Sequence, residues 1–178
     1  MKTHQKGFTL IEAAITIAIL AIIIAIGLPT YQSAVGSARI GDVQTDLNLA
    51  ITAAMRHAMV SSTPVVMCPS RNGEDCMPDI NWSSGWIAFS DPDGDKQRGT
   101  GDPLVWRQGK LPGGVQMFST AGRTRLLFHA NGDNPGSNTT FTLCHQHVAR
   151  SKTIMLANNG RIRQSTPAPS ATMLCGKV

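Results

Sequence analysis

The chain has 178 residues, of which 16 are lysine or arginine and 11 are aspartate or glutamate, so its formal net charge is +5 at pH 7. Beyond a membrane segment, this length suffices for one modest globular domain, and we expect no second one. Only 5% of the residues are aromatic and one is tyrosine, which argues against a base-stacking platform for nucleic acid. None of the four cysteines has a Cys-x-x-Cys spacing, which argues against a zinc site.

The first predicted element is an apolar helix that crosses a membrane. Phe8 to Leu28 form a run of twenty-one residues whose single charge is Glu12. At about 1.5 Å per residue, such a helix spans a bilayer core, and the run is longer than the apolar part of a secretory signal peptide. Because Lys2 and Lys6 precede it, the N-terminus is expected in the cytoplasm and the rest of the chain beyond the membrane.

The start of this run resembles the cleavage site of type IV prepilins. The residues Gly7-Phe8-Thr9-Leu10-Ile11-Glu12 match the motif G-F-T-L-I-E. The resemblance implies that a prepilin peptidase removes residues 1–7 and methylates the new amine of Phe8. It also implies that Glu12, a carboxylate that is costly in a bilayer, pairs with that amine on a neighbouring subunit of a filament. The alternative is an ordinary anchor helix with one tolerated glutamate.

Beyond Pro29 the helix is expected to continue to about Val60 and to become amphipathic. Its apolar stripe consists of Ile40, Val43, Leu47, Ala50, Ile51, Ala54 and Ala58. The polar residues expected to face away from that stripe are Asp42, Gln44, Asp46 and Asn48. Counted from Phe8, the helix would be about 80 Å long. The resemblance implies a weak point at Gly27 and Pro29, since proline removes a backbone hydrogen bond.

Short strands separated by Gly, Pro, Asn and Asp are predicted in the rest of the chain. Their expected bounds are residues 65–68, 85–90, 104–108, 115–118, 125–129, 139–144, 153–156 and 161–164. An antiparallel sheet laid on the outer half of the helix is the economical arrangement and gives an α+β fold. The chain thus divides into a leader (1–7), a transmembrane helix (8–30) and a periplasmic globular domain (31–178) with an irregular tail from residue 164.

The cysteines are expected to form disulfides, because their number is even and an exported domain lies in an oxidising compartment. We favour Cys68 with Cys76 and Cys144 with Cys175, although four cysteines permit three pairings.

A second resemblance lies in the middle of the chain. Cys68-Pro69-Ser70, Cys76 and the segment from Trp82 to Asp91 are similar to GspH/FimT-type minor pilins, which carry the pattern W-x-x-G-W-x-x-F-x-D. Phe128, the strand that ends at Cys144 and the residues from Gly160 to Arg163 follow in the order of that family. The resemblance covers the whole chain and implies a pilin-like fold.

Charge is unevenly distributed between the two halves of the globular domain. From Gly41 to Pro103, nine acidic residues face four basic ones. After Leu104 nine basic residues face a single acidic one, Asp133. Such an asymmetry suits a polyanion such as DNA or an anionic membrane surface, and the alternative is ordinary solvated surface.

Gly160-Arg161-Ile162-Arg163 is the strongest candidate for a binding site outside the membrane segment. In a strand, Arg161 and Arg163 share a face, about 7 Å apart, while Ile162 points into the core; that spacing is close to the phosphate spacing along one DNA strand. In FimT-type minor pilins a G-R-x-R motif is implicated in DNA binding during natural transformation, which this chain matches. Basic residues expected to widen the patch are Arg150, Lys152, Lys177, Arg123 and Arg125.

Other motifs favour structural roles. Asp91-Pro92-Asp93-Gly94-Asp95 fails the EF-hand register and is predicted to be a surface turn. His145 and His147 are expected on one strand face, without a third metal ligand. No arrangement typical of catalysis occurs, so we expect neither an enzyme, nor a cofactor, nor a small-molecule substrate. The main hypothesis is a DNA-binding minor pilin with other pilins as partners, and the alternative is a structural pilus or secretion pseudopilus subunit without DNA binding.

Overall fold

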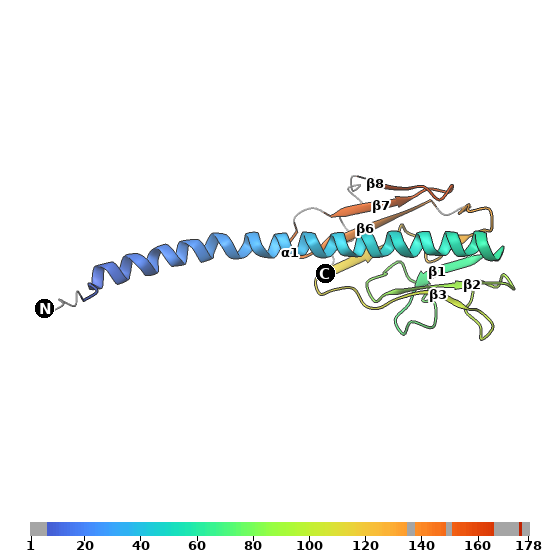
Figure 1. Ribbon diagram of the computed structural model, residues 1–178, viewed down its shortest axis with the longest axis horizontal. Coiled ribbons are helices and arrows are strands. Elements are labelled where there is room, and N and C mark those ends of the chain that lie inside the picture. Colours follow the sequence, from blue (N-terminus) through green and yellow to red (C-terminus); the bar gives the residue numbers. More distant parts are fainter. Residues whose placement is uncertain (1–6, 135–137, 149–150, 166–174, 176–178) are drawn as a thin grey trace, which may run out of the picture.

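The computed structural model describes residues 7–134, 138–148, 151–165 and 175. Its dominant element is α1 (Leu10–Ser61), a helix of 52 residues whose first half projects away from the rest of the molecule (Figure 1). Thr9 caps α1, because its hydroxyl accepts the backbone N–H of Glu12 while the Glu12 carboxylate accepts the N–H of Thr9. The helix therefore starts two residues after the expected Phe8. It ends where Ser62 adopts a left-handed conformation.

The first half of α1 is apolar and bare. The helix is long and apolar enough to cross a membrane, and the most apolar stretch of it has no residue buried within the molecule. It runs unbroken through Pro29, so the predicted weak point does not interrupt it. The hydroxyl of Thr30 donates to the carbonyl of Ile26, 3.0 Å away, beside the site where proline removes a backbone donor.

The second half of α1 carries the predicted apolar stripe, and every member of that stripe is buried. Gln44 was expected to face away, and that expectation is wrong: its side chain is only 8% exposed. It lies one turn from both Ile40 and Leu47, so it falls within the stripe at helical spacing. Asn48 is half-buried, whereas Asp42 is exposed.

In the part of the chain that the structure describes, eight antiparallel strands follow α1, close to the predicted bounds. They are β1 (Val65–Pro69), β2 (Trp86–Ser90), β3 (Leu104–Gln108), β4 (Val115–Phe118), β5 (Leu126–Phe128), β6 (Thr139–His145), β7 (Lys152–Leu156) and β8 (Ile162–Ser165). They form two sheets rather than the single predicted one, with orders β3-β2-β1-β5 and β4-β6-β7-β8. The two sheets lie on either side of the second half of α1 (Figure 1). We call this globular part the head.

The aromatic segment that resembles minor pilins builds the core of the head. The rings of Trp82 and Phe141 meet edge to face, 5.1 Å apart, and the Trp82 indole donates to Ser119. Gly85 has a φ of 115°, and a side chain there would collide with the carbonyl of Gln108. Only glycine fits this position. The segment thus fills space between the sheets.

Two disulfides fasten the periphery of the head. Cys68 pairs with Cys76 and Cys144 with Cys175, at Cα separations of 5.5 and 5.7 Å. The first closes a short loop over the face of sheet β3-β2-β1-β5 that points away from α1, where Ile87 and Phe89 form a second apolar cluster. The second ties Cys175 to the end of β6.

The contrast between Leu47 and Leu49 tests whether the stripe on α1 holds the head together. Leu47 is fully buried and Leu49 is 53% exposed, two residues apart on one helix. Leu47→Ala is expected to destabilise the head by about 2 to 5 kcal/mol because it leaves a cavity, and Leu49→Ala by about 0.5 kcal/mol or less. Thermal unfolding of the full chain in detergent micelles, followed by near-UV circular dichroism, measures both. Equal losses would contradict the assignment.

Candidate functional site

The Gly160 turn joins β7 to β8 and presents the two arginines. The N–H of Gly160 donates to the carbonyl of Ala157 and the N–H of Ala157 to the carbonyl of Arg161, both at 2.9 Å. Gly160 has a φ of 74°, and a Cβ added to it would lie 2.8 Å from the sulfur of Met55 on α1. Glycine therefore serves both the turn and its close packing against the far end of α1.

Arg161 and Arg163 are both exposed, on either side of a half-buried Ile162 that packs against the main core. Arg163 pairs with Met155 and Ile162 with Leu156 across the β7–β8 ladder. Since strand side chains alternate, Arg163 points away from α1, as predicted from the sequence. Arg161 lies just before the first residue of β8, and its N–H donates to the side chain of Asn159. Among the described strands β8 is an edge strand, and both arginines are exposed there.

The structure does not bring Lys152, Arg123 or Arg125 into the same patch as Arg161 and Arg163. Lys152 is exposed but shares its face of β7 with Ile154 and Leu156, which pack toward α1, so it points to the opposite face from Arg163. Arg123 and Arg125 are half-buried around the start of β5, which belongs to the other sheet. Two further predicted residues, Arg150 and Lys177, lie outside the described residues.

One carboxylate lies in the loop beside the arginine-bearing turn. The carbonyl of Gly132 would be 3.2 Å from a Cβ on Gly160, which places the 129–134 loop against the turn. Asp133 belongs to that loop, where its side chain accepts from Asn131. The positive field of Arg161 and Arg163 is thus partly offset on one side.

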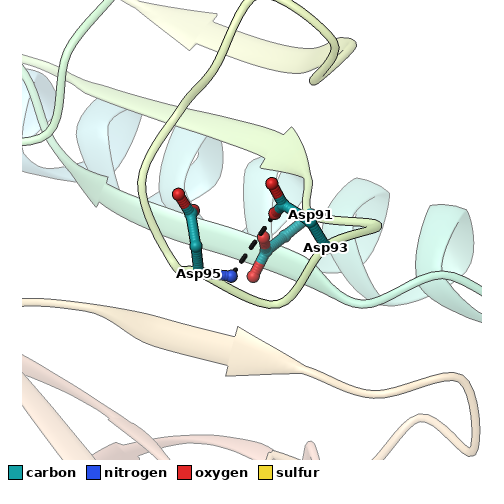
Figure 2. Close-up of side chains that lie close together, drawn as sticks. All are labelled: Asp91, Asp93 and Asp95. Carbon is teal, nitrogen blue, oxygen red and sulfur yellow. Dashed lines mark hydrogen bonds between the residues drawn. The ribbon is translucent and has the colours of Figure 1, made fainter.

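The acidic turn after β2 brings three carboxylates together (Figure 2). Oxygens of Asp91, Asp93 and Asp95 lie within 4.8 Å of one another, a donor set compatible with a divalent cation. Asp91 is buried, and its two oxygens already accept the N–H groups of Gly94 and Lys96. Burial raises the pKa of Asp91, and the hydrogen bond and charge of Asp93 raise it further. This arrangement by itself assigns no metal.

His145 is a buried residue whose role the sequence did not predict. It ends β6, whereas His147 lies in the following turn, so the expectation of two histidines on one strand face is wrong. Its ring lies between Gly36 of α1 and Gly114, and a Cβ at either glycine would approach it to 2.6 Å. The signal that the sequence offered for this buried position was the pair of small residues, Gly36 and Gly114, which leave room for the ring. Burial lowers the pKa of His145, the charges of His147 and Arg39 lower it further, and the Gly113 backbone partly opposes this.

The predicted processing and assembly residues lie at the start of α1. Gly7 and Phe8 are exposed, and Glu12 is held in the capping box with Thr9. Within the described chain, the hydrogen bonds of the Glu12 carboxylate go to Thr9 in the same turn.

Comparison with known families identifies the chain. Residues 43–160 match the family described as "Type II transport protein GspH", and residues 2–28 match the prokaryotic N-terminal methylation motif. This chain belongs to the GspH family. Among curated proteins, the GspH-family chain is 34% identical over 84 residues to the type IV major fimbrial protein FimA of Dichelobacter nodosus. It is 42% identical over 62 residues to the type IV major alpha-pilin of Moraxella bovis.

The GspH-family chain spans about half the length, or less, of these curated relatives: 47% of FimA and 39% of the alpha-pilin, with 47% and 35% of its own length aligned. Among solved structures, the type IV minor pilin FimU of Pseudomonas aeruginosa superposes with a TM-score of 0.53 at 15% identity, over 75% of this chain and 90% of FimU. The minor pseudopilin EpsH of Vibrio cholerae gives 0.52 at 10% identity, over 73% and 98%. These likenesses confirm the predicted fold: a long helix packed on antiparallel sheets.

The buried histidine predicts how the stability of the head depends on pH. Because the pKa of His145 lies below the ordinary value of 6.5 in the folded protein, the unfolded chain binds its proton more readily. Stability is therefore expected to fall as the pH drops through about 6.5, and to be retained above it. His145→Gln should reduce that fall, as measured by thermal unfolding between about pH 7.5 and 5.5. His57→Gln on α1 is the control, and an unchanged pH dependence in His145→Gln would refute the assignment.

Proposed function

We propose that this chain is a minor pilin that enters a type IV pilus and binds double-stranded DNA through Gly160, Arg161 and Arg163, for DNA uptake in natural transformation. The observation that carries the proposal is the exposure of both arginines at the start of β8, an edge strand among the described strands, beside a turn fixed against α1. Guanidinium groups bind phosphate oxygens with paired hydrogen bonds. Contacts of this kind position a duplex without reading its sequence.

Two phosphate contacts give weak binding with a defined dependence on salt. With a slope of about −0.9 per contact, affinity falls about tenfold when the salt concentration rises fourfold. A single head is therefore a weak ligand. Tighter binding requires further cations, for which Arg150 and Lys177 are candidates in the sequence, or several contact points along one DNA molecule.

Assembly requires processing at the N-terminus. In this proposal a prepilin peptidase cuts after Gly7 and methylates Phe8, and Glu12 pairs with the amine of a neighbouring major or minor pilin. Before assembly, α1 is held in the inner membrane with its N-terminus in the cytoplasm and the head in the periplasm. The match to the methylation motif and the bare apolar half of α1 support this order of events.

A structural subunit without DNA binding is the second candidate. In that case the chain would initiate or cap a pilus or a type II secretion pseudopilus. Two observations favour it. The family description refers to type II transport. Lys152 faces away from the arginine pair, so the basic patch formed by the described residues is small.

Replacing both arginines tests DNA binding. Arg161→Ala with Arg163→Ala is expected to abolish a salt-sensitive electrophoretic shift of duplex DNA by the full chain in detergent micelles. The physical reason is the loss of both phosphate contacts, which should lower the salt slope by about two.

The matched control removes the same charge elsewhere. Arg56→Ala with Arg71→Ala replaces two exposed arginines of the acidic half and should leave most of the shift in place. No shift at low salt by the unmodified chain, or equal losses in both pairs, would support the structural subunit instead.

Replacing Gly7 tests the processing step. Nothing lies within 4 Å of a Cβ built on Gly7, so its substitution disturbs recognition by the peptidase rather than the fold. Gly7→Leu, coexpressed with a prepilin peptidase, is expected to keep residues 1–7 and an unmethylated chain, as measured by intact mass spectrometry. Glu12→Val is the control that should still be cleaved. Cleavage of Gly7→Leu at the same bond would be evidence against the assignment.

A further inference from the structure

The end of the head nearest the membrane half of α1 is built by the loop between β3 and β4 and by the turn after β6 (Figure 1). Arg39 of α1 donates to the carbonyl of Gly113 in that loop at 2.8 Å, and Gly36 contacts His145. Gly36 and Arg39 lie about 12 and 16 Å along the helix axis from Leu28, where the apolar run ends. The headgroup layer extends about 5 to 8 Å beyond the hydrocarbon. With α1 upright, this end of the head therefore begins about 4 to 7 Å beyond the headgroup layer, a gap shorter than a Debye length.

A pocket of about 780 Å³ opens at this end. Its polar lining consists of Ser83, Lys110, Gln116, His145, Gln146 and Ser151, and no carboxylate is among the described lining residues. The Nε2 atom of His145 and the hydroxyl of Ser151 are buried without a well-formed hydrogen bond. His145 is only 6% exposed. Among the described residues, neither of these two polar atoms of the pocket has a well-formed partner, a costly state unless a ligand or water satisfies them.

The donors of the pocket suit an oxyanion. Nδ1 of His145 accepts the N–H of His147, so the ring proton sits on Nε2, which is then a donor. Lys110 and Arg39 are exposed cations at the same end. A phosphate group offers acceptor oxygens and negative charge to all of these groups.

Charge is polarised along the axis of α1. The carboxylates of Asp91, Asp93 and Asp95 lie at the opposite end of the head, because the N–H of Asp91 bonds to Pro64 just after α1. Asp42 follows Arg39 by one turn, on the side away from the membrane half. These carboxylates thus lie away from the membrane end, where Arg39 and Lys110 are exposed.

We propose that this pocket, with Lys110, Arg39 and His145, docks the phosphate headgroup of an anionic phospholipid while α1 is held in the membrane. The inference rests on the membrane storage of α1 under the proposed function. A lipid is the occupant because the pocket is at the end of the head that faces the bilayer, where anionic headgroups attract Lys110 and Arg39 within about a Debye length. Docking would hold the head upright on the membrane until the subunit enters a filament.

Hydrogen exchange in nanodiscs tests the proposal. The full chain is placed in discs of phosphatidylcholine alone and in discs with phosphatidylglycerol added at roughly one part in four. Backbone amides of residues 110–116 are expected to exchange about fivefold more slowly in the anionic discs, the factor that one basic residue contributes at such a surface. Lys110→Gln should lose most of this difference.

The matched control is Arg163→Gln, which removes one exposed charge from β8. It should keep the lipid effect while weakening DNA binding, whereas Lys110→Gln should do the opposite, so the two proposals fail independently. Equal exchange in both kinds of disc would overturn the inference. So would equal protection by inorganic phosphate in neutral discs, which would assign a site for small oxyanions instead. A chain that elutes apart from the discs would show that membrane storage itself is wrong.

Discussion

The apolar half of α1 cannot remain in water, and the rest of the molecule depends on that constraint. Large side chains along it are more than half exposed, among them Ile17 at 67% and Ile23 at 61%. Covering one such side chain is worth about 1.5 to 3 kcal/mol. A row of them therefore requires an apolar cover, and the proposed function supplies two: lipid before assembly and the helices of other subunits in a filament.

The other half of the same helix organises the head. One buried stripe on α1 faces both sheets, and the main core runs without a break from Ile40 on α1 to Leu126 in one sheet and Phe141 in the other. Each disulfide fastens a segment that this stripe does not reach. Rigid attachment of the head to α1 means that the helix sets the orientation of every surface site relative to the membrane.

Positive charge is presented at two separate places. The arginine pair lies toward the far end of α1, where Gly160 packs on Met55, and the Lys110 pocket lies at the near end, where His145 packs on Gly36. Under the two proposals above, DNA and lipid therefore need not compete for the same site. The acidic turn at Asp91 adds negative charge at the far end.

The sequence by itself determined the elements, because their signals are local. The apolar run and the stripe predicted the start of α1 to within two residues. Apolar and polar residues that alternate between clusters of turn residues predicted the eight described strands. Cysteine spacing favoured the disulfides that the structure contains. Each of these depends on neighbours within a few residues along the chain.

Only the tertiary structure decided how those elements meet. The division into two sheets follows from β5 pairing with β1 and β4 with β6, which are contacts between distant segments. The burial of Gln44, the orientation of Lys152 and the position of His145 between two glycines likewise depend on which face meets α1. A sequence pattern gives the period of a helix or strand, whereas the partner of each face is selected by packing across the whole chain.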